Sequence, residues 1–141
     1  MRPCVDNWVS RSVGIVGERP FVAILDSSAI VDFTTDSIAL GELLFEAGDD
    51  GGVVGLPALC MAQAVPRCKD RDLLDLLSVH RTSGLIQPSA DWRATAALHD
   101  FVGHFDLTSA MLDAIDYDNF VITRNPTAYG ELVNNHRVVA Y

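Results

Sequence analysis

The chain has 141 residues, 49% of them hydrophobic, which suffices for one buried core and argues against two domains of ordinary size. Its formal net charge of -9 repels nucleic acid at long range, so a phosphate-bearing ligand would need a bound cation, a local basic patch or a basic partner. No apolar run approaches the roughly 18 residues of a membrane span, and no apolar segment of a secretory signal follows the first arginines. We therefore expect a cytoplasmic protein with no membrane contact.

Residues 1–20 carry no clean periodicity, and we interpret them as an N-terminal extension ahead of a single domain at 21–141. The apolar run Phe21–Leu25 is followed at once by Asp-Ser-Ser, which predicts a strand buried on both faces and then a helix start. Helical spacing over 36–48 predicts a helix, and Val53–Leu56 predicts a second strand.

The middle of the chain repeats this alternation. Pro57 suits the first turn of a helix, where its missing N–H costs no hydrogen bond, and Asp70 suits the N-cap of another. Leu85–Pro88 is a short strand candidate, and Ser89 is expected to open the next helix.

The last third predicts a helix from Asp106 or Thr108, a strand at Asn119–Thr123, a short helix at Pro126–Val133 and a final strand at Arg137–Tyr141. Strands and helices thus alternate throughout. The predicted fold class is α/β, with a mostly parallel central sheet and helices on both faces. In such sheets, ligand sites lie beyond the carboxyl ends of the strands.

Polar residues stand at those expected strand ends or beside them, namely Asp26, Asp106 and Asn125. Each alone is as consistent with a helix N-cap. Taken with their flanks, however, they resemble the PIN domain family of metal-dependent ribonucleases, which includes the toxins of toxin–antitoxin pairs. The resemblance covers about residues 21–141 and implies a three-layer α/β/α fold. Four segments carry it: Leu25–Ile30 (LDSSAI), Leu56–Gln63 (LPALCMAQ), Asp106–Ala110 (DLTSA) and Val121–Pro126 (VITRNP).

The resemblance also implies a cleft with four acids that bind Mg²⁺ or Mn²⁺, which activates water to cleave a phosphodiester. Asp26 and Asp106 match two of these positions and are the candidate metal ligands. Gln63 and Asn125 stand where a Glu and an Asp are expected. Losing two charges, at about 2 kcal/mol each, would weaken metal binding nearly a thousandfold if the effects add.

Several neighbouring residues are candidates for supporting roles. Ser28 and Thr123 could orient Asp26 or a bound substrate, although Ser28 is equally suited to helix capping. Among the other acids that could replace the lost charge, Asp32 is the best placed. Arg124 is expected to face away from residues 123 and 125 on a regular strand, and hence to lie at the surface.

The functional expectation is a degenerate PIN-like domain with weak or no activity, binding metal weakly or not at all, with a nucleic-acid- or protein-binding role. Two alternatives stay open. One is an active Mg²⁺- or Mn²⁺-dependent endoribonuclease in which Gln63 and Asn125 act as neutral ligands; the other is a regulatory protein-interaction module, because a fold does not fix a function. By resemblance, the expected partners are RNA, an antitoxin-like protein and a second copy in a homodimer.

Overall fold

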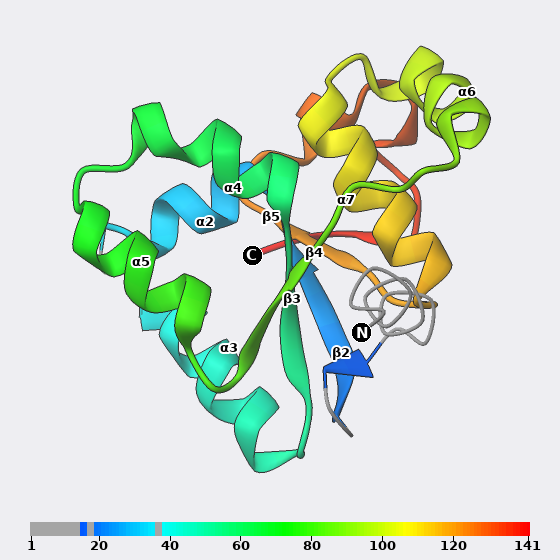
Figure 1. Cartoon of the computed structure of the whole chain (residues 1–141). Helices are drawn as coiled ribbons and strands as arrows, with labels where there is room; N and C mark the ends of the chain where they lie inside the picture. The colour runs from blue at the N-terminus through cyan, green and yellow to red at the C-terminus, as the bar shows by residue number, and fades with distance from the viewer. Residues whose placement is uncertain (1–14, 17–18, 36–37) are drawn as a thin grey trace, which may run out of the picture.

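The structure is a computed structural model that describes residues 15–16, 19–35 and 38–141. A central sheet separates two layers of helices, which confirms the predicted α/β class (Figure 1). Most of the extension expected over residues 1–20 lies outside the described residues. Among the described residues, no helix combines the length and the apolar character needed to cross a membrane.

Five strands of the sheet are parallel, and the chain winds outward from β2 in both directions. From β2 it adds β3 and β4 on one side, and later β5 and β6 on the other. The reversal of winding falls between β2 and β5, where such sheets leave a crevice at the strand ends. In sheet order the strands are β4 (Ser83–Ile86), β3 (Val53–Pro57), β2 (Arg19–Leu25), β5 (Val121–Thr123) and β6 (Val138–Ala140), and β1 (Ile15–Val16) pairs antiparallel with β2.

The helices cover both faces of this sheet (Figure 1). On one face lie α2 (Ser27–Phe33), α3 (Ile38–Asp49) and α5 (Arg71–Val79). On the other face lies α7 (Phe105–Asp116), with α6 (Trp92–Val102) packed on its outside. At the carboxyl ends of the strands, α4 (Ala58–Ala64) contacts both α2 and α7 and continues into the short helix η1 (Val65–Arg67), while the 3₁₀ segment η2 (Pro126–Leu132) contacts α6.

The core forms where the sheet meets α2 and α7. Every residue of β3 is buried. In β2, for which burial on both faces was predicted, Ala23, Ile24 and Leu25 are buried, while Phe21 and Val22 are only partly buried. Ile24, Leu25, Leu56 and Met111 are at most 1% exposed, and each side chain of this size contributes about 1.5–3 kcal/mol on burial. This packing fixes the strand ends, and hence the residues that follow them.

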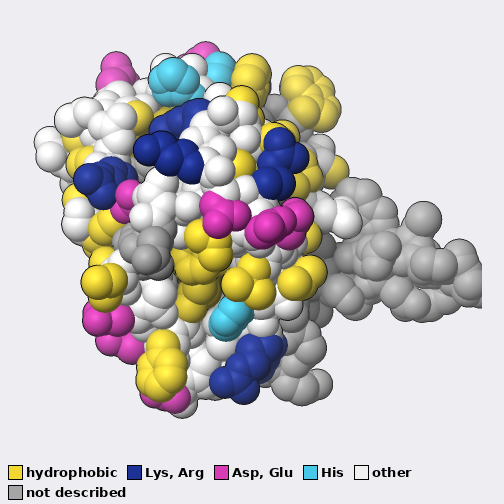
Figure 2. Space-filling view, turned by 90° about the vertical axis from the view of Figure 1, so that its left-hand side faces the viewer, with side chains coloured by type: hydrophobic (Ala, Val, Ile, Leu, Met, Phe, Trp, Pro, Cys, Tyr) yellow, Lys and Arg dark blue, Asp and Glu magenta, His cyan; other side chains and the backbone are white. Residues whose placement is uncertain are grey.

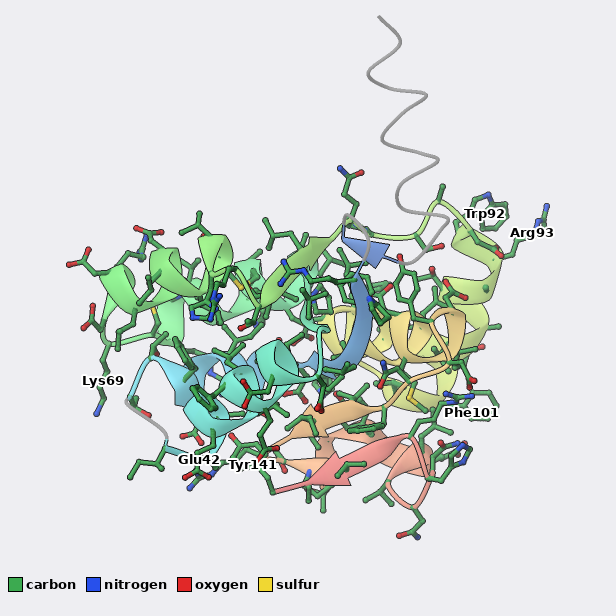
Figure 3. All side chains as sticks on the ribbon, turned by 90° about the horizontal axis from the view of Figure 1, so that it is seen from below. Glu42, Lys69, Trp92, Arg93, Phe101 and Tyr141 are labelled. Atoms are coloured by element: carbon green, nitrogen blue, oxygen red, sulfur yellow. The ribbon has the colours of Figure 1, made fainter. Side chains whose placement is uncertain are left out.

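Helix α6 buries one residue, Val102. Trp92 and Phe101 point outward from it (Figure 3), with exposed fractions of 66% and 49%. Gly103 ends α6 in the left-handed region at φ 85°, a conformation that costs glycine little, and the chain turns there into α7. The turn places Asp106 in the first turn of α7.

Several boundaries differ from the sequence prediction. Helix α6 is capped by Asp91, which accepts from the Ala94 N–H at 3.0 Å, and not by Ser89. Pro57 pairs within β3 as its last residue, so the helix begins one residue later than expected. Asp70 caps α5 as predicted, through the backbone N–H groups of the first turn.

Candidate functional site

A cleft of about 500 Å³ opens beyond the carboxyl ends of β2 and β5. Asp26, Gln63, Asp106 and Asn125, the four positions singled out in the sequence, all line it. Ser28 lines it too, whereas Thr123 is fully buried and absent from the lining. The remaining lining residues are Ser27, Val31, Asp32, Thr35, Arg67, His104, Leu107, Arg124 and Ala128.

Asp26 is buried and surrounded by hydrogen-bond donors. It caps α2, and its Oδ1 accepts from the Ala29 N–H at 3.0 Å and from Ser28 Oγ at 2.7 Å. Its Oδ2 accepts from the hydroxyl of Tyr129 at 2.7 Å. Both carboxylate oxygens are therefore engaged, in a side chain that is 1% exposed.

Ser28 and Thr123 join α2 to the end of β5. Their hydroxyl oxygens are 3.2 Å apart, and Ser28 Oγ also accepts from the Arg124 backbone N–H at 3.0 Å. Thr123 Oγ1 accepts from the Asn125 N–H at 3.0 Å, which fixes the backbone at the start of η2. The Asn125 amide oxygen in turn accepts from Thr127 Oγ1 at 2.9 Å.

Asp106, in the first turn of α7, is held by contacts with α2 and α4. Its Oδ2 accepts from Ser27 Oγ at 2.5 Å, and its backbone carbonyl accepts from the thiol of Cys60 at 3.1 Å. Burial raises the pKa of Cys60 well above its usual value, and the carboxylates of Asp26, Asp106 and Asp113 raise it further, although Ser27 acts in the opposite direction. Cys60 is thus a neutral thiol and a poor nucleophile.

Two arginines reach the cleft and offset much of its negative charge. Arg67 lines one wall, and the guanidinium of Arg124 pairs with Asp32 Oδ2 at 2.9 Å. Asp32 raises the pKa of Arg124, and its Oδ2 also accepts from Tyr141 Oη at 2.7 Å. Three aspartates face two arginines, so the lining carries one net negative charge when His104 is neutral, in a chain of net charge -9.

The arginine at 124 corrects the expectation drawn from strand alternation. Its side chain is 63% exposed, as predicted, but it lines the cleft and does not point to the other face. The reason is that β5 ends at Thr123, so the alternation of a regular strand does not extend to the next residue.

The sequence resemblance implies a divalent cation in this cleft. Among the described residues, no group of three or more His, Cys, Asp or Glu is arranged to hold a metal ion. Gln63 and Asn125 are neutral, and the acidic oxygens of Asp26 already accept three hydrogen bonds. Hard cations need several well-placed oxygen ligands, so these side chains do not fit Mg²⁺ or Mn²⁺ as they stand.

Sequence reasoning missed Tyr129 and gave little weight to Arg67. Tyr129 is fully buried and hydrogen-bonds Asp26, which is 103 residues away in the sequence. Nothing in the local pattern of η2 singles it out. Arg67 belongs to a run of alternating charges that usually marks a solvated helix face. Asp113, placed further along α7 than the cleft, is buried at 1% exposure.

A second depression, of about 350 Å³, lies between α3 and α5, away from the cleft. Phe45 lines it and is 71% exposed; Ile38 on α3 and Val79 on α5, outside the lining, are 77% and 78% exposed. Figure 2 shows apolar side chains gathered across the middle and lower part of this face, with basic and acidic side chains both above and below them. Its lining also includes Phe33, Gly41, Leu44, Gly48, Asp49, Leu76, His80, Arg81 and Thr82.

Comparison of the chain with models of protein families, with curated proteins and with solved structures found no match.

Proposed function

We propose that this chain is a PIN-like domain, related to metal-dependent ribonucleases, that binds single-stranded RNA in its cleft and cleaves it poorly or not at all. One observation carries the proposal: the four positions of the resemblance converge on a single cleft, where two are acids and two are amides. Convergence of residues from 26 to 125 is what a related site requires. The amides and the neighbouring arginines distinguish this cleft from a four-acid metal site.

Poor cleavage follows from the chemistry available in the cleft. Hydrolysis of a phosphodiester in such sites depends on metal-bound water and on metal stabilisation of the leaving oxygen. Asp26 accepts from three donors, and Asp106 accepts a hydrogen bond from Ser27. Gln63 and Asn125 are exposed and neutral, so they can hydrogen-bond an RNA without supplying the missing charge.

Binding would rest on Arg67 and Arg124, which both line the cleft and carry guanidinium groups that suit a phosphate, the one of Arg124 being paired with Asp32 when RNA is absent. Two phosphate contacts predict a slope of about -1.4 for log K against log salt on a single strand. The chain's net charge opposes association, so we expect weak binding that strengthens at low salt.

Fluorescence anisotropy with a short single-stranded RNA tests this proposal, in EDTA and in Mg²⁺ separately. We expect binding in both buffers, and loss of most of the salt dependence in Arg67→Gln with Arg124→Gln. Arg81→Gln is the matched control, because Arg81 is exposed in the other depression. Unchanged binding in the double variant contradicts the proposal.

A parallel cleavage assay distinguishes the proposed RNA-binding domain from the alternative, an active endoribonuclease. Metal-dependent cutting of the same RNA that disappears in Asp26→Asn would establish a working endoribonuclease with Mg²⁺ or Mn²⁺ as cofactor. The proposal expects no such cutting above the level of the Asp26→Asn variant.

A second candidate function, a protein-interaction module, is favoured by the exposed apolar side chains around the depression between α3 and α5. The occupant would be an apolar helical segment of an antitoxin-like partner. Co-purification with the product of an adjacent reading frame tests it: Phe45→Glu should abolish the complex and Phe101→Glu, on α6, should preserve it. Sedimentation of the chain alone tests the predicted homodimer.

A further inference from the structure

We infer that the hydroxyl of Tyr129, by taking up an acceptor site on Asp26 Oδ2, weakens the binding of a divalent cation in the cleft, in addition to the loss of charge at positions 63 and 125. This inference rests on the proposed function, since it concerns the same cleft. It assigns to Tyr129 the role of a positioning residue, which acts through Asp26 and does not itself touch substrate.

The contacts of Asp26 carry the inference. An ionised carboxylate offers about four acceptor sites on its two oxygens. Ser28 and Ala29 take two of them at Oδ1, and the Tyr129 hydroxyl takes a third at Oδ2, at 2.7 Å. Ser28 and Ala29 lie on α2 beside Asp26 and are local capping contacts. Tyr129 is different, because it comes from a distant segment and donates to Oδ2, the oxygen that the cap of α2 does not use, from a buried position outside the cleft lining.

The backbone holds Tyr129 firmly in that place. Tyr129 is 0% exposed, so its ring cannot swing aside without opening the core. The next residue, Gly130, has φ 59°, and a Cβ built on it would lie 2.6 Å from the carbonyl oxygen of Phe101. Only glycine permits this close approach of η2 to α6. Burial of its ring and the tight packing of the next residue therefore both hold Tyr129 in place.

Removal of the hydroxyl alone should then free one more acceptor site on Oδ2 for a cation. A hydrogen bond to a charged group corresponds to about a tenfold to hundredfold change in an equilibrium constant. Phenylalanine keeps the ring and its packing, so Tyr129→Phe changes the donor and little else. In the natural chain this release would not suffice, because the two amides still lack charge.

The experiment therefore compares two variants in which the acids are restored. The first carries Gln63→Glu with Asn125→Asp, and the second adds Tyr129→Phe. Titration with Mn²⁺, followed by the electron paramagnetic resonance of the free ion, gives the affinity of each without reference to catalysis. We expect the triple variant to bind Mn²⁺ at least about tenfold more tightly than the double variant.

A matched control uses another tyrosine. Tyr117 ends α7 at the far side from Asp106 and packs its ring on Phe21, so Tyr117→Phe in the double background should leave Mn²⁺ affinity unchanged. Equal affinity of the double and triple variants overturns the inference. So does a folded triple variant that binds no Mn²⁺, or an equal gain from Tyr117→Phe.

If Tyr129→Phe does not fold, a second measurement tests the hydrogen bond on which the inference depends. In the natural protein, NMR with labelled tyrosine should show the Tyr129 hydroxyl proton in slow exchange with water, as a buried donor to a carboxylate. Fast exchange of that proton overturns the inference. Neither outcome depends on RNA binding in EDTA, so failure of the proposed function and failure of this inference are distinguishable.

Discussion

Replacement of Asp26 by alanine tests whether this carboxylate is a structural acceptor at the base of the cleft. The change removes the N-cap of α2, which costs about 1 kcal/mol. It also leaves the buried hydroxyl of Tyr129 without its acceptor, at a cost of about 1–3 kcal/mol. We therefore expect Asp26→Ala to lower the free energy of unfolding by roughly 2–4 kcal/mol, measured by urea denaturation at neutral pH.

Tyr129, the hydrogen-bond donor to Asp26, provides the decisive comparison. If the cost arises from the orphaned hydroxyl, then Tyr129→Phe in the Asp26→Ala background should recover about 1 kcal/mol or more, and the double-mutant cycle should show coupling of that size. Asp32→Ala is the control, because Asp32 also accepts from a tyrosine at 2.7 Å but nearer the surface. Its cost should stay below about 1 kcal/mol.

The opposite result would refute this reasoning. If the carboxylate served only to bind a metal, its burial without the metal would cost desolvation energy that no other interaction offsets. Its removal would then be neutral or stabilising. Unchanged or increased stability of Asp26→Ala would therefore show that the three donors do not compensate the buried charge.

Two further predictions concern the surroundings of the cleft. Burial and Asp26 raise the pKa of Tyr129, and burial raises that of Cys60, so both keep their protons in the native state at pH values where the unfolded chain loses them. Stability should accordingly fall as pH rises above about 9, and Tyr129→Phe should flatten the fall above about pH 10; a flat urea midpoint from pH 8 to 11 would contradict this. Gly130→Ala should lower the free energy of unfolding by at least about 1 kcal/mol in urea, because of its positive φ and the carbonyl 2.6 Å from the added Cβ, and unchanged stability would show that η2 relaxes freely.

The fold followed from local patterns to a large extent. Buried parallel strands need continuous apolar runs, and Phe21–Leu25 and Val53–Leu56 are such runs within β2 and β3. Helix starts were less secure, because Ser89 and Asp91 are both good caps and only packing selects between them. Pro57 was similarly ambiguous. A proline can be the last residue of an interior strand if its missing N–H is not needed for a hydrogen bond of the sheet, and it can equally begin a helix.

The sequence by itself determined which side chains would follow the strand ends, since the order of apolar runs and turns places Asp26 and Asn125 at one edge of the sheet whatever their partners. Only the tertiary structure decided what those side chains contact. Tyr129 reaches Asp26 across 103 residues, and Ser27 reaches Asp106 across 79. Contacts between distant segments depend on packing angles and backbone closure, which leave no periodic trace in a single sequence. For that reason the cleft could be located from the sequence, and the occupancy of its carboxylates could not.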